Sequence, residues 1–183
     1  DRTEASAALY EARKLVPNTG ITFSRGQLIP AVDDEEQLAA KTADAVAAFD
    51  AVVEQFQGTP QETVANLEAG SALYRIGKHE EALGYFEKAA GGEGDIALLA
   101  SSSKGAALES LERFEDAAVV YESVRSRTQG ALKEQATLDL ARACEGKGDF
   151  ARARELYAAF EEEFPASTQL STVQRRSAAI AAR

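Results

Sequence analysis

The residues of this sequence that could carry out chemistry are few, and they do not form a catalytic or metal-binding pattern. His79 is the only histidine and Cys144 is the only cysteine. A histidine-activated nucleophile or a zinc site needs several such groups, so we expect neither within one chain. We expect His79 to be a surface or packing residue, and Cys144 to be a buried and unreactive thiol.

Two further patterns resemble functional motifs only in part. The Gly-Lys pairs at Gly77 and Gly146 lack both the upstream glycine and the following hydroxyl residue of a phosphate-binding loop. The three glutamates at 161–163 are consecutive, and consecutive residues on a helix point in different directions rather than toward one metal ion. We therefore predict no catalytic residues, no metal and no cofactor.

The composition limits the kind of partner. Lys and Arg total 20 and Asp and Glu total 30, so the formal net charge is −10. This sign disfavours nucleic acid and anionic membrane surfaces. No apolar run is long enough to span a membrane, and we expect no direct membrane contact by these residues. Because the sequence begins at Asp1 and has no methionine, we expect that a signal or anchor can precede it.

Internal repeats organise the middle of the chain. Three segments, 63–97, 98–133 and 134–165, align without gaps inside each repeat. Each places a small residue in an expected first helix and an aromatic ring in the second: Gly70 with Phe86, Gly105 with Tyr121, and Ala141 with Tyr157. A small residue lets the partner helix approach closely, so each segment is expected to be a packed helix pair.

This pattern, with the alanines at 82, 117 and 153 and with Pro165, resembles the tetratricopeptide-repeat (TPR) family. Glu112 departs from it by replacing the turn glycine of the second repeat. The resemblance implies an all-α fold, a right-handed α-solenoid of antiparallel helix pairs. It also implies that ligands bind in a concave groove lined by the first helices.

The flanking segments complete the expected architecture. We expect residues 1–62 to form a degenerate repeat, with a first helix over 3–16, an irregular insert over 17–32 and a long helix over 33–57. Thr59, Pro60 and Glu62 are typical of the start of the next helix. Ser167 is expected to cap a terminal helix within 166–183 that covers the last repeat. The apolar insert residues Ile21, Phe23, Leu28 and Ile29 should either fold onto the repeats or bind a partner.

Carried over residue by residue, the resemblance predicts a partner-binding face. It comprises Leu67, Ser71, Tyr74, Arg75, Leu99, Ser102, Ala106, Glu109, Gln135, Leu138, Arg142 and Glu145. Leu67 and Ser71 stand where chaperone-binding members carry a carboxylate clamp, so that ligand is not expected. Tyr74, Arg75 and Arg142 are the candidate anchors. The alternative is that these side chains are only solvent-facing.

These observations favour a non-catalytic scaffold that binds a peptide or protein partner. The order of helix, insert and repeats is similar to bacterial envelope TPR proteins. We therefore expect assembly of an envelope complex on the periplasmic side of an inner membrane, held by an N-terminal anchor, with a cytoplasmic location as the alternative. Two other functions remain open: a self-associating structural protein that forms a homo-oligomer, and a regulatory TPR domain of a larger enzyme or sensor.

Overall fold

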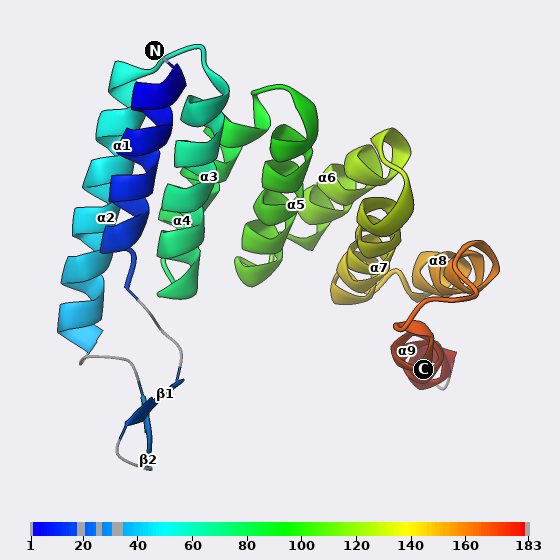
Figure 1. Cartoon of the computed structure of the whole chain (residues 1–183). Coiled ribbons are helices and arrows are strands. Elements are labelled where there is room, and N and C mark those ends of the chain that lie inside the picture. The colour runs from blue at the N-terminus through cyan, green and yellow to red at the C-terminus, as the bar shows by residue number, and fades with distance from the viewer. Residues whose placement is uncertain (1, 18–20, 25–26, 31–34, 182–183) are drawn as a thin grey trace. The chain divides into compact units, whose positions relative to one another are not determined.

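Helices make up most of the chain. The computed structural model describes residues 2–17, 21–24, 27–30 and 35–181, and there the all-α class predicted from the sequence is confirmed (Figure 1). The chain divides into two compact units, Asp1–Ala100 and Ser101–Arg183. The helices are α1 (Arg2–Leu15), α2 (Glu35–Gln55), α3 (Pro60–Arg75), α4 (His79–Ala90), α5 (Gly94–Ser110), α6 (Phe114–Arg127), α7 (Gly130–Gly146), α8 (Phe150–Glu163) and α9 (Leu170–Ala181).

The expected irregular insert contains a short β-hairpin, which corrects that prediction. Strands β1 (Ile21–Ser24) and β2 (Gln27–Pro30) pair antiparallel, with Ile21 opposite Pro30 and Ser24 opposite Gln27. The β-branched and aromatic residues of β1 favour this pairing, but four residues per strand are too few to give a clear alternation in the sequence. The expected packing of the insert's apolar side chains concerns atoms outside the described part of the structure.

The first unit is built on a core shared by α1, α2 and α3. Leu9 of α1 is buried together with Phe49 and Val52 of α2, and Ala65 and Ala69 of α3 belong to the same cluster. These apolar residues recur three or four positions apart, which places them on one face of each helix. The core therefore joins the N-terminal helix pair to the first repeat.

The start of α3 follows the predicted signals. Thr59 is the N-cap, and its Oγ1 accepts a hydrogen bond from the backbone nitrogen of Glu62 at 3.4 Å. Pro60 occupies the first turn, where its missing N–H costs nothing. The Glu62 carboxylate accepts from the backbone nitrogen of Gly58 at 2.6 Å. The backbone nitrogens of Gly58 and Glu62 are therefore satisfied locally.

Small residues on first helices allow aromatic rings on second helices to lie against the backbone, as predicted. A Cβ added to Gly70 would lie 2.7 Å from Cε1 of Phe86. A Cβ added to Gly105 would lie 2.5 Å from Cε1 of Tyr121. Both rings are buried, so neither has space to move away. Glycine at these two positions therefore sets how closely α3 approaches α4 and α5 approaches α6.

The turns inside the repeats share one backbone conformation. Gly77 and Gly148 have φ values of +80° and +83°, in the left-handed region, and Glu112 at the equivalent position has a φ of 58°. The backbone nitrogen of the next residue then bonds back into the first helix, as Arg113 does to the Leu108 carbonyl at 2.8 Å. The turn of the second repeat therefore keeps the same geometry without glycine, at the cost of backbone strain.

The terminal helix begins later than predicted. Ser167 does not start it, because α9 begins at Leu170. The Ser167 hydroxyl instead donates to the Glu134 carboxylate at 2.5 Å and accepts from the backbone nitrogen of Gln169 at 2.9 Å. Val173 and Ile180 of α9 are buried, and α9 packs against α8.

The contact of Gly70 with Phe86 predicts a substitution that destabilises the protein although it raises helix propensity. Gly70→Ala should lower the free energy of unfolding by about 1–3 kcal/mol, because the new methyl group overlaps the buried ring. The matched control is Gly84→Ala in α4, where nothing lies within 4 Å of the added Cβ. That change should stabilise the helix by up to about 1 kcal/mol. Urea unfolding measures the free energy of unfolding of both variants. Equal effects of the two substitutions would contradict the close contact between Gly70 and the Phe86 ring.

Candidate functional site

None of the twelve residues predicted for the binding face belongs to the buried core. On α3 the side chains of Leu67, Ser71 and Tyr74 are half-buried and that of Arg75 is exposed. The buried residues of the same helix occupy different positions, including Ala69 and Leu73. α3 therefore has one face packed in the core and another that the core leaves open.

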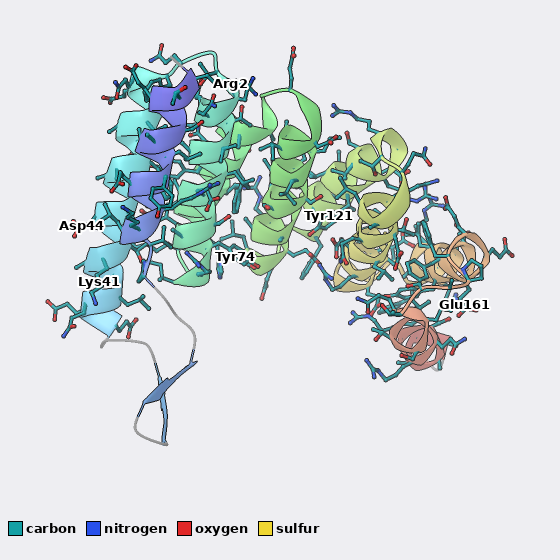
Figure 2. All side chains as sticks on the ribbon, in the orientation of Figure 1. Arg2, Lys41, Asp44, Tyr74, Tyr121 and Glu161 are labelled. Carbon is teal, nitrogen blue, oxygen red and sulfur yellow. The ribbon has the colours of Figure 1, made fainter. Side chains whose placement is uncertain are left out.

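Tyr74 is held in place by other aromatic rings. The ring centroid of Tyr74, which is labelled in Figure 2, lies 4.8 Å from that of His79 and 6.4 Å from that of Phe86. His79 is thus a packing residue, as one of the predicted alternatives states. The Ser71 hydroxyl donates to the Leu67 carbonyl within its own helix at 2.8 Å. On this face the ring of Tyr74 is therefore held by its aromatic neighbours.

In the second unit, Glu109 and Arg142 form a two-pronged ion pair between α5 and α7. The Arg142 Nε and Nη2 atoms donate to the two carboxylate oxygens of Glu109 at 2.9 and 2.6 Å. The Nη1 atom of Arg142 lies 2.9 Å from Oδ1 of Asp139. Tyr121 completes the group from α6, because its hydroxyl donates to Oε2 of Glu109 at 2.8 Å (Figure 2).

The same arrangement recurs one repeat later. The Tyr157 hydroxyl donates to Glu145, twelve residues earlier, as Tyr121 does to Glu109. Arg176 of α9 donates through Nε and Nη2 to the Glu145 carboxylate at 3.0 and 3.2 Å. Each network thus joins a tyrosine on the second helix of a repeat, a glutamate on the first helix of the same repeat and an arginine on the helix that follows the repeat. We refer to the two sets as the Tyr-Glu-Arg networks.

Burial and hydrogen bonding shift the pKa values of these groups. The hydrogen bond to Glu109 raises the pKa of Arg142, so the guanidinium stays charged. Burial raises the pKa of Asp139 although Arg142 opposes the shift. Burial is the main cause that raises the pKa of Tyr157 to about 12, and the hydrogen bond to Glu145 is the second. Burial raises the pKa of Tyr121 as well.

The structure therefore assigns several predicted binding residues to internal contacts. Glu109 and Arg142 are brought together, whereas Glu145 pairs with Arg176, which was not among the predicted residues. Arg142 was expected to be an anchor for a partner, but its guanidinium is occupied by two carboxylates of its own chain. The recurrence of Glu and Tyr at equivalent repeat positions is the sequence signal that could have revealed the networks.

Three further observations concern the thiol, metal binding and membrane-spanning helices. Cys144 is free and buried, and burial raises the pKa of its thiol. Within the described residues, no group of three or more His, Cys, Asp or Glu side chains is placed to hold a metal ion. In that same part of the chain, none of the helices combines the length and apolar character needed to cross a bilayer.

Comparisons with known proteins identify the repeats. A family model described as "Tetratricopeptide repeat" matches residues 39–97 and 103–168. The chain is similar in structure to nearly identical TPR-like repeats of a putative kinesin light chain from Podosopora anserina. That similarity has a TM-score of 0.69 and 14% identity, and covers 98% of this chain and 86% of the other. The chain is also similar to a MamA RS-1 ArsTM double mutant.

This second similarity has a TM-score of 0.59 and 17% identity, and it covers 81% of this chain and 90% of that chain. At these identities the likeness to both structures concerns the fold alone. No curated protein matches the sequence.

The ion pair of Arg142 predicts a loss of stability when this side chain is made neutral. Arg142→Met should lower the free energy of unfolding by about 1–3 kcal/mol, because Glu109 and Asp139 lose their shared counter-ion. Both acids have side chains that are only 11% exposed. The matched control, Arg75→Met on α3, should change the free energy of unfolding by less than about 0.5 kcal/mol. If the effects of Arg142→Met and Glu109→Gln were additive in the double variant, the two side chains would not be coupled.

The raised pKa of Tyr157 predicts a loss of stability at alkaline pH. The folded state keeps a proton that the unfolded chain releases between pH 10 and about pH 12, so this stabilisation is complete below pH 10 and falls as the pH rises toward 12. Urea unfolding across this window should show a shallower decline for Tyr157→Phe than for the unmodified chain. An unchanged slope would show that Tyr157 does not titrate as the structure implies.

Proposed function

Because the chain belongs to the tetratricopeptide-repeat family, whose repeats generally act as protein-interaction modules, we propose that it is a non-catalytic scaffold. In this proposal it binds a segment of a protein partner along the first helices of its repeats. One observation carries the proposal: every residue at the family's ligand-contacting positions lies outside the core.

Recognition is assigned to the part of this face that lies outside the Tyr-Glu-Arg networks. In the first unit it comprises Leu67, Tyr74 and Arg75 of α3, together with Leu99 of α5, whose side chain is 46% exposed. A half-buried tyrosine beside an exposed arginine is the combination enriched at interface hot spots. In the second unit Leu138 supplies a further apolar contact.

The Tyr-Glu-Arg networks have a supporting role in this proposal. Arg142 pairs with Glu109 and Asp139, and Arg176 pairs with Glu145, so these arginines are engaged within the chain. Beside such paired charges, apolar and hydrogen-bonding contacts are favoured over a strong electrostatic pull. In the first unit, the partner segment is therefore expected to insert apolar side chains beside Tyr74.

No chemistry is assigned to the scaffold. A nucleophilic role for Cys144 would need an accessible thiolate, whereas the thiol is buried and its pKa is raised. His79 has its ring against Tyr74, and its Nδ1 has no hydrogen-bond partner among the described residues, so nothing there orients it as a catalytic base.

The proposal extends to assembly of a bacterial envelope complex on the periplasmic side of the inner membrane. This part is supported by the order of the elements: a helix, an insert and then repeats, which is similar to the order in envelope members of the family. Fractionation of cells that express the complete gene product tests this location. Recovery in the cytoplasmic fraction would remove this part of the proposal and leave the binding role unaffected.

The binding role is tested with peptides selected from a random library displayed on phage. The double variant Arg75→Glu with Leu99→Ser should bind the selected peptides at least about tenfold more weakly, because it removes about 1.4 kcal/mol or more of contact energy. Isothermal titration calorimetry measures the change.

The matched control carries the same kinds of change on second helices. Val119 of α6 is 66% exposed and Arg154 of α8 is exposed, so Val119→Ser with Arg154→Glu alters neither the core nor the proposed face. This variant should bind as the unmodified chain does. Equal affinities of both double variants would reject the first-helix face as the binding surface.

A further inference from the structure

The network around Arg142 holds one acid more than the network around Arg176. Arg142 is the counter-ion of both Glu109 and Asp139, whose side chains are only 11% exposed. In the other network, Arg176 pairs with Glu145 alone among the described residues. Two carboxylates beside one guanidinium leave the first network with a negative charge that the chain itself does not balance. Such a charge is costly where it is largely buried.

Asp139 uses one of its two carboxylate oxygens within the chain. Oδ1 accepts a hydrogen bond from Nε2 of Gln135 at 2.9 Å and lies 2.9 Å from Nη1 of Arg142. Oδ2 accepts no hydrogen bond from any of the described residues. The residue is nevertheless only 8% exposed, and polar atoms of side chains buried to this degree are normally hydrogen-bonded. Oδ2 is therefore an unused acceptor on a largely buried side chain.

This unused oxygen reaches solvent on the open side of α7. Among the described residues, the enclosed side-chain atoms without a hydrogen-bond partner are Oδ1 of Asn66 and Nδ1 of His79. Oδ2 of Asp139 also lacks a partner but is not enclosed, so the exposed part of this side chain includes it. Gln135 lies four positions before Asp139 and Arg142 lies three positions after it, so the three share one face of the helix. Both neighbours belong to the predicted binding face, and both are accessible to solvent.

The chemistry of this position favours a cation that carries N–H groups. A carboxylate oxygen can only accept, and the unbalanced negative charge repels an anion. Burial raises the pKa of Asp139 although Arg142 opposes the shift, which agrees with a charge that lacks part of its compensation. A metal ion does not fit, because no group of three or more His, Cys, Asp or Glu side chains in the described part of the chain is placed to hold one. The ligand that fits is an ammonium or guanidinium group.

We propose that Asp139 is a further recognition residue of the first-helix face, and that its Oδ2 binds the side chain of a lysine or arginine of the partner segment. This inference rests on the proposed function, because it assigns one contact within that face. It accounts for a charge that burial makes costly, since Asp139→Asn would keep an acceptor for the same two donors and remove the charge. Asp139 therefore serves recognition at the expense of folding.

The test uses small probes in place of the partner. Nα-acetyl-lysine amide and Nα-acetyl-arginine amide are titrated into the ¹⁵N-labelled full chain and followed by NMR, with Nα-acetyl-citrulline amide as the neutral comparison for arginine. The two cations should cause saturable shifts at the side-chain amide of Gln135 and at the backbone amide of Asp139. Shifts of equal size with the citrulline probe, or shifts that do not saturate, would overturn the proposal.

Two substitutions assign the binding to this position. Asp139→Asn should weaken the binding of Nα-acetyl-arginine amide at least about tenfold, because a charge-assisted hydrogen bond is lost. The matched control is Glu162→Gln, which removes one negative charge from an exposed position of α8 outside the networks. This control should leave the saturable shifts unchanged. Equal weakening by both substitutions would show only a general attraction of cations to an acidic chain, and would reject the site.

Thermal unfolding separates recognition from a purely structural role of Asp139. Because the pKa of Asp139 is raised in the folded state, its charged form is less favourable there than in the unfolded chain. Asp139→Asn should therefore melt at pH 7 at the same temperature as the unmodified chain or at a higher one. A lower melting temperature together with lost binding would make Asp139 a structural residue and would overturn the proposal.

The peptides selected from the phage library separate this contact from the proposed function. Peptides selected on the unmodified chain should be enriched in lysine or arginine, and selection on Asp139→Asn should lose this enrichment. Equal enrichment in both selections would overturn the cation contact. If such peptides still depended on Arg75 and Leu99, the binding role would be unaffected.

Discussion

The structure depends on how closely the two helices of a repeat approach each other. Phe86 and Tyr121 lie against the backbone of Gly70 and Gly105, at distances of 2.7 and 2.5 Å from where a Cβ would stand. No other residue type leaves this space, and the rings are too deeply buried to move away. This contact fixes the helix spacing, and with it the direction in which the open face of each first helix points.

The same aromatic position also connects one repeat to the next. When the ring is tyrosine, its hydroxyl reaches a glutamate on the first helix, and that glutamate binds an arginine of the following first helix. The first repeat has Phe86, which has no hydroxyl, and Tyr74 stands where the other repeats have Glu109 and Glu145. An aromatic contact there replaces the charged network, and Tyr74 and Arg75 belong to the face that we propose to bind a partner.

The features predicted correctly from the sequence are those that are local or repeated. The pairs of small and aromatic residues recur in register, and the cap at Thr59 is set by residues within three positions of it. The start of α9 at Leu170 is later than predicted because a turn, in which the Ser167 hydroxyl accepts from the backbone nitrogen of Gln169, precedes the helix. Arg142 was expected to be free because its acceptor, Glu109, also lies 33 residues away. The hairpin was missed because its strands have only four residues each.

The most direct test of the central contact is a double-mutant cycle between Gly105 and Tyr121, measured by urea unfolding. If the ring over the glycine backbone sets the helix spacing, Gly105→Ala should be strongly destabilising alone. It should cost much less when Tyr121→Leu has removed the ring, so the two changes should be coupled by about 1 kcal/mol or more. An equal cost of Gly105→Ala in both backgrounds would contradict this account of the fold.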